Sequence, residues 1–167
     1  MKTWIFFAIF PFLVACVETD ESGMKETEYR PLLIKRAELE NSIKTLAPQP
    51  LKNTGKIYIK GNYIYLAEKY KGIHVINNSN PSKPERIQFI QIPGCADIAI
   101  KGNIMYADNC VDLVAIDIAD IKNIKLSSRK RDIFPEINPP DLEYIPSAFQ
   151  KHNRPDSTYI LEWVEKY

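Results

Sequence analysis

One stretch of this chain occurs twice, and the repeat constrains the fold more than any other feature. Residues 57–65 and 98–106 are identical at six of nine aligned positions, with an offset of 41. After a one-residue deletion, residues 72–77 align with residues 112–117. A period near 40 made of short β-rich segments is typical of propeller-type arrays with four strands per blade. The sequence therefore predicts a mainly β fold, an incomplete β-propeller-like array of about two four-stranded blades.

Each repeat contains its own tight turn. Gly61-Asn62 and Gly102-Asn103 separate two β-rich segments by two residues, and such turn positions must tolerate a positive φ. We expect strands at 56–60, 63–67, 73–77, 86–92, 97–101, 104–108, 113–118 and 124–128. Loops rich in turn-forming residues follow the third strand of each repeat, at 77–84 and 117–123.

The third strand of each repeat carries a motif that resembles a known family. In the second repeat the motif is Leu113-Val114-Ala115-Ile116-Asp117. In the first repeat it is Ile73-His74-Val75-Ile76-Asn77, followed by the turn Asn80-Pro81-Ser82-Lys83-Pro84. The chain resembles the N-terminal part of the LVIVD-repeat lipoproteins that bacteria export, over roughly residues 28–167. The resemblance implies a propeller-like fold and says little about activity.

Two blades are fewer than a closed propeller needs. Propellers close with about four to eight blades, so two blades leave apolar faces and strand edges open to other molecules. We expect a binding or assembly module that associates with its own copies, or with another protein, through open blade edges. A truncated, non-functional fragment of a longer propeller protein is an alternative. An enzyme with its site on the propeller loops is a further, less favoured one.

The N-terminus has the pattern of an export signal. Lys2 precedes an apolar segment at 4–14 that is too short to span a bilayer, and Ala15 precedes Cys16. This arrangement resembles the signal peptide of bacterial lipoproteins, here residues 1–15, in which Cys16 is lipidated and becomes the first mature residue. An ordinary secretory signal is the alternative. We expect a chain that reaches the membrane through this lipid, detectable by palmitate labelling.

Residues 16–30 are polar and acidic, and they predict a tether between the lipid and the folded domain. Val17 follows the cysteine in place of aspartate, which in the usual sorting pattern of lipoproteins suggests the outer membrane. The acidic residues of the tether resemble signals that send lipoproteins to the cell surface, although a solvated spacer is equally acidic. The expected location is the outer membrane or cell surface, and its periplasmic face stays open.

The remaining boundaries follow from composition and periodicity. A short helix over 35–46 and a Pro-rich linker are expected within 31–50, because Pro48 and Pro50 end the helical pattern. The repeats occupy 51–131, divided into 56–96 and 97–131. A Pro-rich loop and a last strand near 158–166 are expected within 132–167.

Cys95 and Cys110 are the candidates for a disulfide. In a hairpin with its two-residue turn at Gly102-Asn103, opposed positions sum to 205, so the two cysteines are predicted to face each other. An oxidising compartment favours a bridge. However, the register places them at a hydrogen-bonded pair, where the wider Cα separation strains a bridge. Both outcomes stay open.

No motif in the chain predicts catalysis or ligand binding. His74 is interpreted as an outward or hydrogen-bonded strand residue, and Asp97, Asp108 and Asp112 as turn and strand-end residues. The run 129–131, Arg-Lys-Arg, is interpreted as a solvated strand end. Neither metal-ligand spacing nor a phosphate-binding glycine loop occurs, so no catalytic residue, metal or cofactor is expected. The net charge of +1 gives no reason to expect nucleic acid as a partner.

Overall fold

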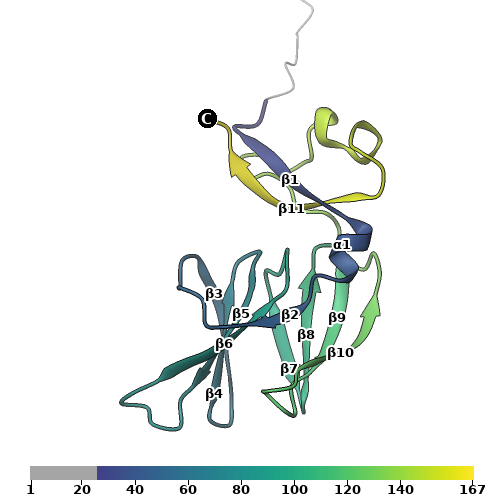
Figure 1. Ribbon diagram of the computed structural model, residues 1–167. Coiled ribbons are helices and arrows are strands. Elements are labelled where there is room, and N and C mark those ends of the chain that lie inside the picture. Colours follow the sequence, from purple (N-terminus) through teal and green to yellow (C-terminus); the bar gives the residue numbers. More distant parts are fainter. Residues whose placement is uncertain (1–25) are drawn as a thin grey trace, which may run out of the picture.

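The computed structural model describes residues 26–167, which form three antiparallel sheets. The first repeat lies in a sheet of five strands, and the second in a sheet of four. A two-stranded sheet lies at one end of both (Figure 1). The expected mainly β, propeller-like fold is confirmed, and the sheets do not close into a ring. The expected signal peptide, Cys16 and most of the tether lie outside the described residues.

All eight strands predicted in the repeats are present, with bounds shifted by at most two residues. The first sheet contains β3 (Thr54–Lys60), β4 (Tyr63–Glu68), β5 (Gly72–Asn77) and β6 (Glu85–Gln91). The second contains β7 (Ile98–Lys101), β8 (Ile104–Asn109), β9 (Asp112–Asp117) and β10 (Lys125–Lys130). In both sheets the strands pair in chain order, so each sheet is an up-and-down meander like a propeller blade.

The turns follow from the residues that form them. Gly61 and Gly102 have φ of 55° and 58° in two-residue turns, as the sequence predicts. The one-residue deletion between the repeats falls in the next turn. Glu68 pairs with Gly72 across three residues, whereas Asn109 pairs with Asp112 across two. Because this difference is confined to a turn, the strands on either side of it keep their repeat relationship.

The two repeat sheets pack face to face over one apolar core. The first sheet contributes Tyr65, Ala67, Ile73 and Val75, and the second contributes Ile98, Met105, Ala107, Val114 and Ile116. These two sets do not correspond in the repeat alignment, in which Tyr65 aligns with Tyr106. The sheets therefore meet through opposite faces, as successive blades of a propeller do and as two halves related by a twofold axis do not.

The first strands of the two sheets, β3 and β7, lie side by side. The Tyr58 hydroxyl donates a hydrogen bond to the carbonyl oxygen of Ile100 at 2.8 Å. Lys60 Nζ donates to Asn103 Oδ1 at 2.6 Å. These bonds fix the register of the two sheets along the strand direction.

A small cap lies at one end of the sheets, where β1 (Tyr29–Lys35) pairs with β11 (Thr158–Glu165). Trp163 is buried in the cap and donates its indole N–H to the carbonyl oxygen of Ile137 at 2.9 Å. The last strand was predicted, but β1 was not. Residues 29–35, which the sequence assigns to the tether and linker, form a strand because they pair with β11. This partner lies about 130 residues further along the chain, so no local pattern predicts the strand.

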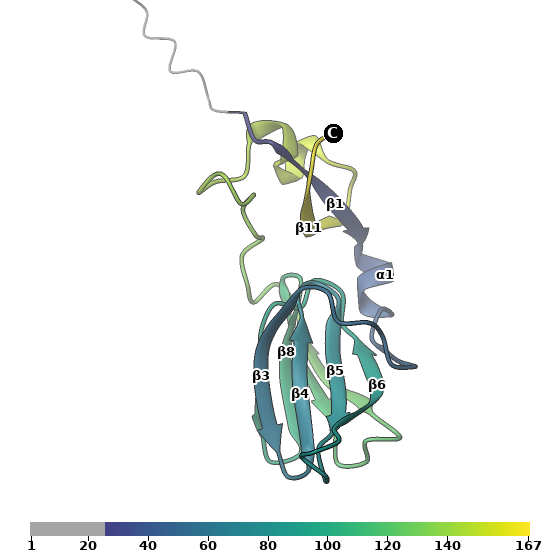
Figure 2. The ribbon, with the colours of Figure 1, turned by 90° about the vertical axis from the view of Figure 1, so that its left-hand side faces the viewer.

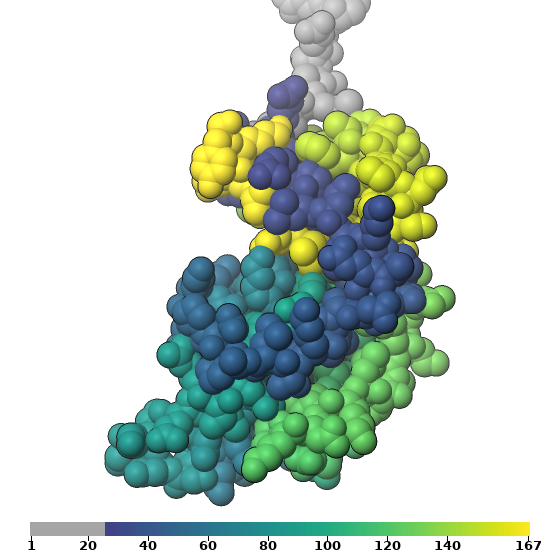
Figure 3. Space-filling model, in the orientation of Figure 1, coloured from purple at the N-terminus to yellow at the C-terminus, as the bar shows by residue number. Residues whose placement is uncertain are grey.

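The predicted helix over 35–46 is wrong in its length. Helix α1 spans only Arg36–Glu40, and the chain then forms β2 (Lys44–Leu46), which pairs with the outer edge of β6. The edge of β6 offers backbone hydrogen bonds to an extended segment, and these override the helical periodicity of residues 41–46. Figure 3 shows this segment in blue, crossing from the cap over the two sheets.

Gly72, at the start of β5, lies very close to the backbone of β6. Its φ is +145°, and a Cβ there would lie 2.1 Å from the carbonyl oxygen of Ile90. We predict that Gly72→Ala lowers the free energy of unfolding by about 3 kcal/mol, because the two backbones must separate. Gly55→Ala is the matched control, since a Cβ there meets its neighbours at 3.6 Å. Equal urea midpoints for the two variants would contradict the prediction.

Candidate functional site

The face of the first sheet that points away from the second sheet is apolar and open. We call it the outer face of the first sheet; it carries Ile57, Ile59, Ile64, Leu66 and Ile76. Ile57 is 60% exposed and Ile59 is 64% exposed. Figure 2 shows that β3, β4 and β5 present this face without another sheet over it. Exposed isoleucines side by side on one face of a sheet are typical of an interaction surface.

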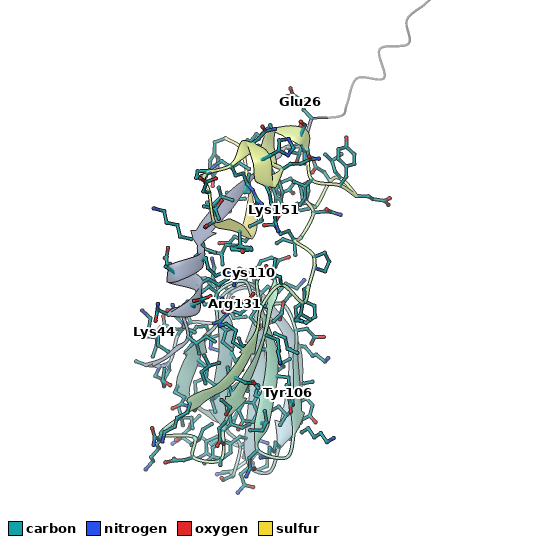
Figure 4. The ribbon with its side chains drawn as sticks, turned by 90° about the vertical axis from the view of Figure 1, so that its right-hand side faces the viewer. Glu26, Lys44, Tyr106, Cys110, Arg131 and Lys151 are labelled. Carbon is teal, nitrogen blue, oxygen red and sulfur yellow. The ribbon has the colours of Figure 1, made fainter. Side chains whose placement is uncertain are left out.

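The second sheet also has an open side, which we call the outer face of the second sheet. It carries Ala99, Tyr106, Asp108 and Leu113, and Tyr106 is 38% exposed. Tyr106 lies in the middle of this face, away from the cap (Figure 4). Between these side chains and Phe134 lies a hollow of about 410 Å³. The molecule therefore has two open faces, on opposite sides of the two-sheet stack.

The repeat motifs occupy β5 and β9, near the middle of each sheet. Ile73, Val75, Val114 and Ile116 point into the core between the sheets. The last motif residue shapes the following loop: Asn77 Oδ1 accepts the N–H of Ser79 at 2.9 Å. Asp117 Oδ1 accepts the N–H of Ala119 at 2.8 Å in the second repeat. The motif thus encodes a buried strand and the turn that ends it.

His74 is buried on the outer side of β5, as a hydrogen-bonded residue. Its Nε2 lies 3.0 Å from Glu68 Oε2, and its ring packs on Phe89 with the ring centroids 4.8 Å apart. Glu68 also accepts the backbone N–H groups of Lys52 and Asn53. Burial alone would raise the pKa of Glu68, but these N–H groups and His74 outweigh burial and lower it.

In the second repeat, Asp108 accepts backbone N–H groups in the same way as Glu68 does in the first. It accepts the N–H groups of Ala96 and Asp97 at 2.9 Å, in the segment that enters β7. Each repeat thus uses one carboxylate near the end of its second strand to hold the chain that enters its first strand. The sequence does not predict this role for Glu68, because its N–H partners lie outside the aligned segments.

Asp112 lies at the centre of a buried ion-pair cluster. Its Oδ2 accepts hydrogen bonds from Arg36 Nη1 and from Arg129 Nη1, both at 2.6 Å. Its Oδ1 accepts the N–H of Asp132 at 3.1 Å. The interpretation of Arg129 as part of a solvated strand end is therefore wrong, since its side chain is only 10% exposed.

This cluster joins the cap to the second sheet. Arg36 belongs to α1, and its guanidinium also lies over the ring of Tyr159 in β11, 4.1 Å from the centroid. Burial alone would raise the pKa of Asp112, but the hydrogen bonds from the two arginines outweigh it and lower the pKa. The position of an aspartate at a strand end was predicted, whereas its partners were not.

Cys95 and Cys110 are free thiols in the structure. The predicted register, in which opposed positions sum to 205, holds along β7 and β8 but ends at the pair Ile98–Ala107. Cys95 then turns into the core, and Cys110 lies in the β8–β9 turn with a φ of 56°. The two thiols have different neighbours, since Cys95 Sγ faces the carbonyl oxygen of Asp97 and Cys110 Sγ that of Pro93.

A second hollow, of about 560 Å³, lies between the first sheet and the cap. Glu68 and Lys71 are in its lining, but Lys71 is paired with Glu162 of β11 and Glu68 is held as described above. Within residues 26–167, no group of three or more His, Cys, Asp or Glu side chains is placed to hold a metal ion. In the same range, no helix is long and apolar enough to cross a membrane.

The Asp112 cluster predicts a specific loss of stability. Asp112→Asn removes the negative charge from between two arginines, and we expect the free energy of unfolding at pH 7 to fall by about 3 kcal/mol. Asp97→Asn is the control, because Asp97 is 65% exposed in its ion pair with Lys56 and should cost less than about 1 kcal/mol. Urea titrations of both variants measure the difference.

The same cluster predicts how stability depends on pH. Because folding lowers the pKa of Asp112, its contribution is complete above the pKa of the unfolded chain, about 3.9, and is lost as the pH falls below that value. The difference in unfolding free energy between the wild type and Asp112→Asn should therefore be largest at pH 7 and shrink near pH 3. A difference that stays constant over this range would contradict the role assigned to the carboxylate.

The thiols give a further prediction. Burial raises the pKa of the Cys110 thiol to about 12, and burial also raises that of Cys95 well above its ordinary value. We expect both thiols to react slowly with iodoacetamide in the folded protein and to be alkylated fully, without reductant, in denaturant. Mass analysis of the protein after alkylation in the folded state and in denaturant measures the extent of reaction. A mass lower by two hydrogens, with neither thiol alkylated in denaturant, would show a disulfide bridge.

Comparison with known proteins agrees with this architecture. A family model described as the LVIVD repeat matches the chain twice, over residues 52–88 and 94–129. These matches cover most of β3–β6 and β7–β10, the two meanders. No curated protein and no solved structure matches the chain significantly. The two repeats that the sequence predicted are confirmed, and the chain contains two copies of the LVIVD repeat.

Proposed function

We propose that this propeller-like protein is a lipid-anchored binding or assembly module at the outer membrane or cell surface. The observation that supports binding is the open apolar face of the first sheet, with Ile57 and Ile59 more than half exposed. Fully burying an isoleucine side chain in a contact stabilises that contact by about 1.5–3 kcal/mol relative to leaving it exposed. A face that carries several of them is stabilised when another protein surface covers it.

The acidic groups in the repeats favour binding over catalysis. The carboxylates of Glu68, Asp108 and Asp112 are taken up by backbone N–H groups or by arginines that hold the fold together. A general base needs a lone pair that faces a substrate. The apolar outer faces, by contrast, are accessible as they stand. Binding through these faces is therefore the proposed activity.

The anchoring proposal rests on the sequence before residue 26. A short apolar segment followed by Ala15 and Cys16 provides the lipid attachment point. Several buried acyl chains, at about 0.8 kcal/mol per methylene, would hold the protein firmly on a membrane. The tether would then separate the sheets from the membrane surface.

The lipid anchor is tested by one substitution in the full chain expressed in bacteria. We expect wild-type protein to incorporate labelled palmitate and to sediment with membranes, and Cys16→Ala to lose both properties. Cys110→Ser is the matched control, because it also removes one thiol and should leave labelling and sedimentation unchanged. Membrane sedimentation of Cys16→Ala at the wild-type level would contradict the anchor.

The binding proposal is tested by purifying the full chain from detergent extracts and measuring its mass in solution. A defined assembly, with copies of the chain or with another protein at fixed stoichiometry, is the expected result. A single chain without any associated protein, both in the extract and after cross-linking in cells, would contradict it.

A further inference from the structure

The two outer faces of this molecule are related to its internal interface through the repeat. Ile57 and Ile59 of the first sheet align with Ile98 and Ile100 of the second, identical residues at identical strand positions. Ile98 is 2% exposed and Ile100 is 9% exposed, because they pack against the first sheet. Their equivalents on the first sheet are 60% and 64% exposed. The outer face of the first sheet is thus a copy of a surface that is buried elsewhere in the same chain.

The other half of the internal interface is also repeated on the outside. Tyr65 is 2% exposed at the centre of the internal interface, and its repeat equivalent is Tyr106, 38% exposed on the outer face of the second sheet. Ile73 is likewise buried, and its equivalent is Leu113 beside Tyr106. The molecule therefore carries both halves of its own internal interface a second time, one half on each open face.

We propose that a second copy of this chain occupies the outer face of the first sheet. It does so through the outer face of its own second sheet, in a head-to-tail contact that reproduces the internal interface. This inference rests on the proposed binding function and names its partner. Ile57 and Ile59 of one copy then pack against Tyr106 and Leu113 of the next.

The polar contacts along β3 and β7, the first strands of the two sheets, fit this arrangement. Internally, Lys56 Nζ lies 2.9 Å from Asp97 Oδ1. In the contact between copies, Asp97 takes the place of Lys56 and Lys56 takes the place of Asp97, so opposite charges meet again with their roles exchanged. The bond from Lys60 to Asn103 is likewise replaced by one from Lys101 to Asn62.

The contact between copies differs from the internal one at the position of Tyr58, whose hydrogen bond has no equivalent there. Internally, Tyr58 lies over the backbone of Ile100. Its equivalent in the second repeat is Ala99, which would lie over the backbone of Ile59 in the next copy. The smaller side chain borders the hollow of about 410 Å³ next to Tyr106. This hollow provides room for the exposed isoleucines of the neighbouring copy.

The first test is the mass of the full chain in detergent, measured by light scattering after size exclusion. We expect wild-type protein to form an oligomer, and Ile59→Arg to shift it to a single chain with its unfolding midpoint little changed. Leu126→Arg is the matched control: Leu126 is 42% exposed but lies opposite Ile116, on the other side of its sheet, and should keep the oligomer. A wild-type monomer, or an oligomer unaffected by Ile59→Arg, would overturn the inference.

The second test distinguishes the head-to-tail contact from other pairings. Full chains carrying Ile59→Cys and Ala99→Cys are mixed, oxidised and compared with wild type on non-reducing gels. We expect a cross-linked dimer well above the wild-type background only in the mixture. Cross-linking of Ile59→Cys with itself would overturn the inference, because it reports a symmetric contact.

The two proposals fail in different ways. A chain that is monomeric but co-purifies with a different protein at fixed stoichiometry would overturn the inference of a second copy and leave the binding function standing. A chain that has no partner of either kind would overturn both.

Discussion

The apolar contact between the two repeat sheets is the interaction on which the rest of the structure depends. Each sheet carries apolar side chains on both of its faces, because a propeller blade packs both faces against neighbouring blades. The sheets meet through opposite faces, with Tyr65 on one side and Met105 on the other. As a consequence, two related repeats stacked in this way leave one copy of each contact face without a neighbour among residues 26–167.

The chain covers one edge and one end of the two-sheet stack but leaves the two outer faces open. Strand β2 pairs with the exposed edge of β6, which removes a row of free backbone groups that would otherwise favour aggregation. The cap covers one end of both sheets and is held by the cluster around Asp112, where Arg36 and Arg129 meet one carboxylate. A buried carboxylate between two arginines fixes the position of α1, because any shift would leave a charge unpaired.

The strands of the repeats could be predicted because their signals are local. Gly61 and Gly102 mark the turns, alternation marks the strands, and the repeat checks each assignment against the other. Strand β1 and the shortened α1 could not be predicted, since both depend on partners far along the chain, β11 and β6. The pairing of Asp112 with Arg36 could not be predicted for the same reason. Arg36 lies 76 residues away in the sequence, and no spacing rule connects the two residues.

The repeat relationship also bears on how an assembly of this chain would be arranged. A head-to-tail contact forms either a closed ring or an open filament, and propeller geometry favours closure at about four to eight blades. With the two blades that residues 26–167 form in each copy, closure corresponds to rings of about two to four copies. Rotation about one axis keeps every copy in the same orientation, so all caps, each of which contains the start of β1 at Tyr29, would lie on one side of the ring. A ring with the starts of all β1 strands on one side is the arrangement that the proposed anchor at Cys16 requires on a single membrane surface.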